Sequence, residues 1–166
     1  MPLHNFNHFI SWSDFISRTS RPTNVSEDAQ IHPEIRPGKI KLASKGKAVT
    51  IAEVDISIGL VKSDCWVVES KKSDYLLNHE QKHYDIVAIS AREFYNALLK
   101  MSASSTHELQ TMVTNLQENV QKRVAEVDAR YDDQTKHSLD KTIQDSWDKK
   151  IAAEKQKPDG SIDNLP

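Results

Sequence analysis

The pattern of apolar and polar positions divides the chain into a region of strands followed by a region of helices. Between residues 54 and 60, apolar and polar side chains alternate, as a strand with one buried face requires. Two shorter stretches, 40–43 and 65–68, are expected to form further strands. The polar connections 44–47 and 62–64 are short and favour antiparallel pairing, because a parallel crossover needs a dozen or more residues. We therefore expect a small antiparallel or mixed sheet.

Beyond Ser73 the apolar residues recur every three or four positions, which is the spacing of one helix face. A first helix is predicted at 74–101, with Ser73 or Asp74 as its N-cap. A second begins after Ser105, where Ser-x-x-Glu forms a capping box, and keeps its apolar face as far as Tyr131. A third is expected to carry Leu139, Ile143, Trp147 and Ile151.

The two ends of the chain differ from its middle. Residues 1–38 combine aromatic residues with turns at 21–24 and 36–38, and are expected to wrap the core through Phe6, Phe9, Trp12 and Phe15. Residues 156–166 are polar and predict a flexible tail. The predicted fold is a single α+β domain over 1–155, with a small N-terminal sheet packed on the first helix and two further long helices behind it.

Composition narrows the class of protein. Of the 166 residues, 37% are hydrophobic and 28% are charged, so a folded core is expected. The net charge is -2 with basic residues interspersed among acids, which excludes a phosphate-binding stripe and makes nucleic acid an unsuitable partner. Cys65 is the single cysteine and is expected to be buried. No apolar run reaches the length of a membrane span, and the first residues do not form an export signal.

Chemistry concentrates in the first predicted helix, in the sequence His79-Glu80-Gln81-Lys82-His83. On a helix, His79 and His83 lie one turn apart and can converge on one metal ion. A catalytic zinc also needs a carboxylate beside its water to act as general base, and Glu80 fits this need. The motif follows a strand and lies one turn inside an amphipathic helix, which is the layout of zinc peptidases.

A catalytic zinc normally takes three protein ligands, so a third must come from elsewhere. His107 lies at the start of the second helix, and Glu108 closes its capping box. His137 lies in a polar break between two helices, where its side chain does not compete with core packing. The residues favour His137 and leave Glu108 open.

Four blocks carry a resemblance to a bacterial family of unknown function whose members are regarded as zinc peptidases. They are Ile10–Phe15, Cys65–Val67, His79–Ile86 and Tyr131–Ser138, followed by Gln144 and Trp147. The resemblance implies a zincin-like metallopeptidase domain that binds Zn2+ through His79, His83 and His137, with Glu80 as general base. Lys82 and Ser138 stand where the family has glycine.

Further residues are expected to support the site. Asp85, Asp132 or Thr135 can accept a hydrogen bond from a ligand imidazole, and Tyr131 can donate to a developing oxyanion. Tyr131 also continues the apolar stripe of the second helix, so a core position stays open for it. Trp12, Trp66 and Trp147 are expected in the core.

The predicted function is a zinc-dependent metallopeptidase-like hydrolase that acts on a peptide or protein substrate paired with a sheet strand. Two alternatives stay open: a non-catalytic zinc-binding or protein-interaction module on the same fold, and a helical scaffold whose exposed histidines bind nothing. Relatives suggest an exported, periplasmic or extracellular protein, and a cytoplasmic one is compatible with the chain. The oligomeric state is not predicted.

Overall fold

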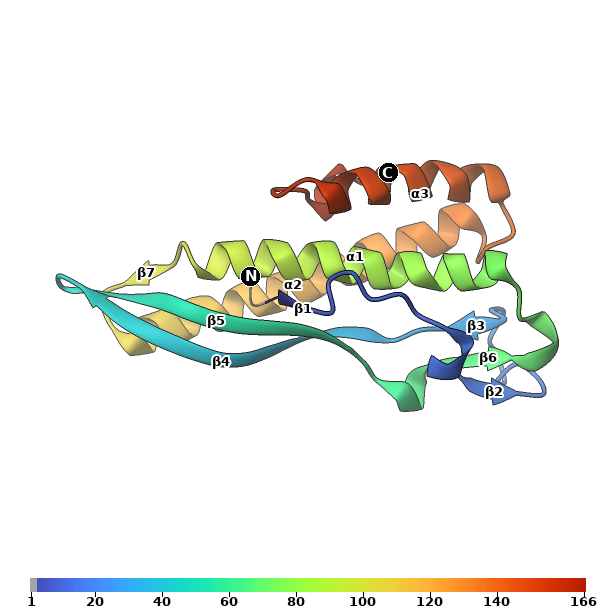
Figure 1. The fold of residues 1–166 in the computed structure, drawn as a ribbon, viewed down its shortest axis with the longest axis horizontal. Coiled ribbons are helices and arrows are strands. Elements are labelled where there is room, and N and C mark those ends of the chain that lie inside the picture. Colours follow the sequence, from blue (N-terminus) through green and yellow to red (C-terminus); the bar gives the residue numbers. More distant parts are fainter. Residues whose placement is uncertain (1–2) are drawn as a thin grey trace.

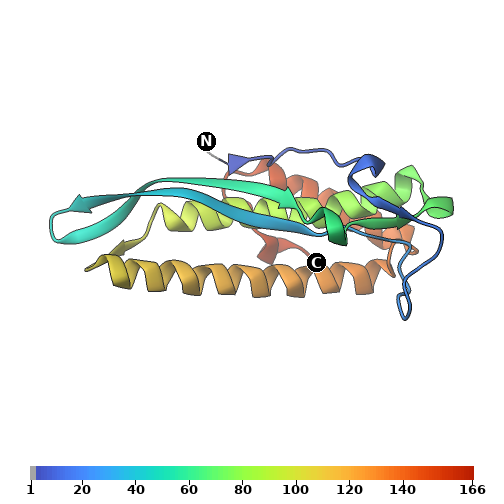
Figure 2. The ribbon, with the colours of Figure 1, turned by 90° about the horizontal axis from the view of Figure 1, so that it is seen from below.

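The computed structural model describes residues 3–166 and has an α+β architecture with mixed sheets and three long helices. The helices are α1 (Asp74–Leu98), α2 (Thr106–Thr135) and α3 (Lys141–Gln156). α1 lies between a long β-hairpin and α3 (Figure 1). α2 runs alongside α1 (Figure 2), and residues of β4 and α2 face a common groove. The expected α+β class is confirmed.

The hairpin consists of β4 (Pro33–Lys45) and β5 (Ala48–Leu60), which pair in antiparallel register. Gly46 closes the turn with a φ of 64°, a conformation that glycine adopts without strain. β4 is much longer than the strand predicted at 40–43. The turn predicted at 36–38 is wrong, because these residues continue β4 and only a register shift follows Pro37.

Four short strands complete the sheets. β1 (Leu3–His4) pairs with β5 in parallel, and β7 (Ser102–Ala103) pairs with it in antiparallel orientation. β6 (Trp66–Val68) is the centre of a second sheet, between β2 (Ile16–Arg18) and β3 (Ala29–Gln30). The predicted antiparallel pairing across 62–64 is therefore wrong: these residues form a 3-10 turn that directs β6 away from β5.

α1 and α2 begin where the caps predicted at Ser73 and Ser105 place them, and α3 begins after a cap at Asp140 that is not predicted from the sequence. Ser73, Ser105 and Asp140 each accept a hydrogen bond from a backbone N–H of the first turn of α1, α2 and α3. α1 ends at Leu98, three residues before the predicted end. The prediction that Leu139 lies on the third helix is wrong, because Leu139 precedes the Asp140 cap and is 80% exposed.

α1 is the centre of the fold because it contributes to two hydrophobic clusters. One cluster lies between α1 and the sheets and contains Val87, Phe94 and Ile56. The other lies between the three helices and contains Ile86 and Trp147. Every residue from 83 to 92 is buried, as a helix covered on all sides requires. Trp66 and Trp147 are buried and Trp12 partly buried, as expected, and so is Cys65, whose burial raises its pKa.

Both ends of the described chain contact this core. Phe15 is buried and Phe6 partly buried, whereas Phe9, an expected anchor, is 83% exposed. The sequence predicts a polar, flexible tail from residue 156. In the structure Ile162 and Leu165 are buried in the helical cluster, so two apolar residues hold this segment against the helices.

Arg92 on α1 ties the same segment down. Its guanidinium donates hydrogen bonds to the carbonyl oxygens of Glu154, Lys155 and Gly160, at 2.7 Å, 2.8 Å and 3.3 Å. It thereby satisfies backbone acceptors at the C-terminus of α3, which otherwise lack partners. Within residues 3–166, no helix combines the length and apolar character that crossing a membrane requires.

Candidate metal centre

Three side chains from two helices converge at one end of α1. His79 and His83 lie one turn apart on α1, and their Nε2 atoms are 3.2 Å apart. Asp132 on α2 places Oδ1 3.1 Å from both of these nitrogens. Both histidines are buried, at 3% and 6% exposure, so the scaffold with exposed histidines is wrong.

The triangle fits a divalent metal ion. Zinc binds imidazole nitrogen and carboxylate oxygen at about 2.0–2.1 Å in tetrahedral geometry, which separates neighbouring ligand atoms by about 3.3–3.4 Å. The three observed separations, 3.1, 3.1 and 3.2 Å, lie within a few tenths of an ångström of that value. Two imidazoles and one carboxylate are also a donor set that catalytic zinc sites use. His79, His83 and Asp132 can therefore hold a metal ion, whose identity the geometry does not fix.

Each imidazole is oriented by a partner on its outer nitrogen. Nδ1 of His79 lies 3.1 Å from Oε1 of Gln144 on α3, and Nδ1 of His83 lies 2.6 Å from Oδ1 of Asp128 on α2. When Nδ1 donates its proton to such an acceptor, Nε2 is left with a free lone pair that faces the centre. All three helices thus contribute to the site.

The charges of the site favour a cation. Burial acts to raise the pKa of Asp132, but hydrogen bonds from His79 and His83 outweigh it and hold the pKa well below the usual range. Burial lowers the pKa of His79. Burial would also lower the pKa of His83, but Asp128 and Asp132 raise it well above its ordinary value. The imidazoles therefore lie beside two carboxylates, which a bound cation can neutralise.

Glu80 lies on the same turn of α1, and its side chain lines the cavity beside the two histidines. It is 2% exposed, and burial raises its pKa to about 7. The backbone N–H of Ile31 is directed toward the carboxylate and acts to lower this pKa, but burial outweighs it. Its Oε2 is buried and has no hydrogen-bond partner within residues 3–166. A buried carboxylate with a free oxygen beside a metal-binding triangle is suited to accept a proton from water.

The structure places Asp132, rather than His137, in the converging group. His137 lies beside it: its Nδ1 is 3.6 Å from Oδ1 of Asp132, and its Nε2 is 3.4 Å from Oε1 of Glu27. Three successive residues, Lys136, His137 and Ser138, have φ values of 52°, 51° and 72°. This left-handed run sharply ends α2 and turns His137 back toward the cavity that it lines. A role of His137 as a ligand stays a prediction.

Glu108, the other candidate for the third ligand, lies at the opposite end of α2. Its carboxylate accepts hydrogen bonds from the backbone N–H and the hydroxyl of Ser104, at 2.8 Å and 2.5 Å. The helix extends over twenty-four residues from Glu108 to Asp132, which is about 36 Å at 1.5 Å per residue. Glu108 bonds to Ser104 rather than to the N-cap Ser105, so only the Ser105 half of the predicted capping box is formed. Glu108 cannot reach the site, and the neighbouring His107 is exposed at the same end.

The residues expected to support the site have other contacts. Asp85 forms an ion pair with Lys155 at 2.7 Å. Thr135 donates its hydroxyl proton to the carbonyl oxygen of Tyr131 at 2.7 Å. Neither residue contacts an imidazole, so both predictions are wrong, and Asp132 is itself in the converging group.

Sequence reasoning missed Asp128 as the partner of His83 and assigned no role to Gln144. A signal for Asp128 was present, because it precedes Asp132 by four residues and so lies on the same face of α2. Gln144 lies on α3, whose placement against α1 has no counterpart in sequence spacing.

Tyr131 is fully buried behind the imidazoles. Its ring stacks on His79, with centroids 4.7 Å apart and planes inclined by 19°, and meets His83 and Trp147 edge-on. Burial raises the pKa of its hydroxyl, so this group stays protonated. Tyr131 does not line the cavity, so it supports the histidine rings, as a core residue on the apolar stripe would.

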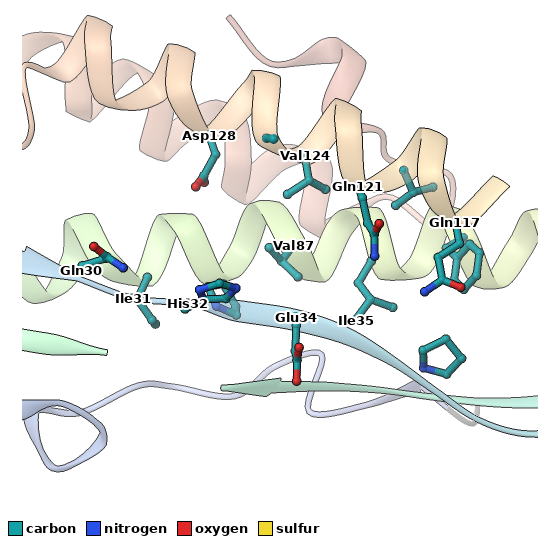
Figure 3. A pocket seen from close by; sticks show the side chains of 15 residues that line it. Gln30, Ile31, His32, Glu34, Ile35, Val87, Gln117, Gln121, Val124 and Asp128 are labelled. Carbon is teal, nitrogen blue, oxygen red and sulfur yellow. The ribbon is translucent and has the colours of Figure 1, made fainter. Parts of the chain in front are cut away.

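The cavity at the triangle is small and joins a larger groove. It encloses about 180 Å3 between α1, α2 and residues 27–31. A groove of about 520 Å3 continues from it between β4 and α2 (Figure 3). Gln30, Ile31 and Asp128 line both spaces, so the groove lies next to the site.

A family model described as "Bacterial protein of unknown function (DUF922)" matches residues 66–138. The matched region includes His79, Glu80, His83 and Asp132 and ends before Gln144. The expected resemblance to a bacterial family of unknown function is confirmed at this level, and the description names no activity. Comparisons with curated proteins and with solved structures found no match.

Proposed function

We propose that the protein is a zinc-dependent hydrolase that cleaves peptide bonds. His79, His83 and Asp132 hold the metal ion, and Glu80 is the general base. The observation that carries this proposal is the near-equilateral triangle of two imidazole nitrogens and one carboxylate oxygen, with the free oxygen of Glu80 in the same cavity.

The chain supplies the groups that the hydrolysis needs. A zinc ion with three protein ligands acts as a Lewis acid and makes water acidic enough to be deprotonated near neutral pH. Glu80 takes the proton of the attacking water and passes it to the leaving amine. Asp128 and Gln144 keep the His83 and His79 rings in the orientation that binds metal. Tyr131 supports the ring of His79 from behind.

His137 has a different place in this proposal from the three ligands. It is 36% exposed at the mouth of the cavity, and its buried Nδ1 faces Asp132. From this position it lies beside the Asp132 carboxylate without a hydrogen bond to it, and it can contact a substrate that enters the cavity. Its removal is therefore expected to weaken metal binding less than removal of Asp132.

The experiment compares zinc-loaded wild-type protein with Glu80→Gln on quenched fluorescent peptide libraries, together with zinc affinity by chelator competition. Glu80→Gln should keep zinc affinity within a few-fold and lose hydrolysis by about 10²–10⁴-fold, the range of a general base. Glu118→Gln, an exposed glutamate on α2, is the matched control and should keep both.

Two results would contradict the proposal. Wild-type protein that binds one zinc ion but cleaves no peptide would indicate the non-catalytic zinc-binding module. Protein that binds no zinc, with His79→Ala unchanged in metal content, would remove the site itself.

A further inference from the structure

The groove beside the metal centre has one wall made of a strand edge. β4 pairs only with β5 among residues 3–166, so its other edge is unpaired, and that edge faces α2. Figure 3 shows Ile35 on β4 and Gln121 and Val124 on α2 around the groove, with Val87 of α1 beneath. Phe94 lines the same floor, so the interior of the groove is largely apolar.

The backbone pattern of β4 limits what this edge can bind. The N–H of Val61 donates a hydrogen bond to the carbonyl oxygen of His32, just before β4. This bond shows that His32 faces β5, and it therefore sets which residues of β4 direct their backbone groups toward β5. In an antiparallel pair these residues alternate, so residues 34 and 36 face β5 while 33, 35 and 37 face the groove. Pro33 and Pro37 have no N–H, so Ile35 supplies the one donor of this stretch.

The two prolines and the single N–H donor favour one kind of binding partner for the edge of β4 over others. Two copies of the chain paired edge to edge would need a row of hydrogen bonds, and prolines on an edge strand prevent such open-ended pairing. A short extended peptide needs few backbone bonds when its side chains enter a pocket. A helical partner would leave the Ile35 N–H unpaired.

We propose that the groove binds an extended peptide segment as an added strand on β4, anchored by the backbone of Ile35 and by an apolar side chain over Val87 and Phe94. This inference rests on the proposed function, because it assigns the groove to the substrate of that site. The groove lies next to the site, because Ile31 lines both spaces and directs its N–H toward Glu80, and this position supports the assignment.

The position of the pocket sets a specificity. Ile35 lies four positions after Ile31, which is beside Glu80, and an extended chain covers about 13 Å over four positions. The preferred apolar side chain therefore lies about four residues from the peptide bond that is cleaved. Polar substrates without such a residue should bind poorly.

Binding is measured on zinc-loaded Glu80→Gln protein by fluorescence anisotropy, so that the probe stays intact. The probe is a labelled decapeptide of alternating valine and threonine, and its comparator has serine in place of each valine. We expect the valine peptide to bind at least tenfold more tightly. Equal affinities for the two peptides, or no binding of either, would overturn the inference.

Two pairs of variants locate the bound peptide. Gln121→Trp fills the groove, whereas Asn119→Trp places the same side chain on an exposed part of α2 that does not line the groove. Ile35→Pro removes the single donor, whereas Ile35→Val keeps it. Gln121→Trp and Ile35→Pro should each weaken binding at least tenfold and their controls less than twofold, in protein shown to be folded by circular dichroism. Unchanged binding in both would overturn the inference.

The same experiments separate this inference from the proposed function. If peptide binds in the groove but the wild type cleaves no peptide, the groove assignment stands and the proposed hydrolase activity is contradicted. Cleavage by the wild type with no preference for valine, and no effect of Gln121→Trp, would keep the hydrolase and remove the groove assignment.

Discussion

The carboxylate of Asp128 lies 2.6 Å from Nδ1 of His83, on the side of the ring opposite the converging triangle. Such a partner fixes the ring orientation and makes the ligand nitrogen more basic. We expect Asp128→Asn to lower zinc affinity about 10–100-fold, the usual effect of losing an outer partner. Competition with a chromophoric chelator measures this change.

Asp133→Asn is the matched control for this prediction. Asp133 lies on the same helix, five residues away, and is exposed. It should keep the zinc affinity of the wild type. Equal affinities of Asp128→Asn and Asp133→Asn would contradict the assigned role of Asp128.

A second comparison identifies the third ligand. Asp132 contacts both imidazoles at 3.1 Å, whereas His137 lies 3.6 Å from Asp132 itself. Asp132→Asn is expected to weaken zinc binding by more than about 100-fold, beyond the effect of an outer partner, and His137→Ala by less than about tenfold. The reverse order would restore His137 as the ligand that the sequence favours.

Local sequence patterns predicted the helices and the first half of the site. The caps at Ser73 and Ser105 and the spacing of His79 and His83 depend only on residues close in sequence, so periodicity and capping rules apply directly. Asp132 was harder to assign as a ligand, because its approach to α1 depends on how the two helices pack.

The sheets show the same limit. β2 and β6 pair although about fifty residues separate them, and no local pattern encodes that contact. The first part of β4 is not recognisable as a strand from the sequence, because it contains Pro33 and Pro37 and proline is depleted in paired strands. Proline is tolerated at these two positions because the backbone nitrogen there faces away from β5. The edge position explains both prolines.

The C-terminal segment offers a test of stability. Ile162 is fully buried against the helical cluster, so Ile162→Ala should lower the free energy of unfolding by about 3 kcal/mol. Leu139→Ala removes an 80% exposed side chain and should change it by less than about 0.5 kcal/mol. Urea denaturation of both variants measures the difference. Equal stabilities would show that the segment is not bound to the helices in solution.

The lowered pKa of Glu154 makes the free energy of unfolding depend on pH in the acidic range. Hydrogen bonds from Lys157, Asn164 and the backbone N–H of Ser161 lower its pKa to about 2 in the folded protein. An unfolded glutamate titrates near pH 4.3, so this contribution is complete above that pH and is lost as the pH falls toward 2. Glu154→Gln should cost about 1 kcal/mol at pH 7 and only a small part of this near pH 2, where about half of the folded carboxylate is protonated.

Urea denaturation at pH 7, 4 and 3 follows this effect. The difference between wild type and Glu154→Gln should shrink steadily across the series. Glu118→Gln, at an exposed position, should show no such trend. A difference that stays constant with pH would mean that the ionised carboxylate of Glu154 does not stabilise the fold.

α2 carries Asp128 and Asp132 at one end and, through Gln121 and Val124, a wall of the groove. If a bound peptide shifts α2 as a rigid body, it also moves Asp132 relative to His79 and His83, and the two occupancies are then thermodynamically linked. Linkage is reciprocal, so if zinc tightens peptide binding by some factor, the peptide must tighten zinc binding by the same factor. Through the long helix, the zinc affinity of the site would then depend on whether a peptide occupies the groove.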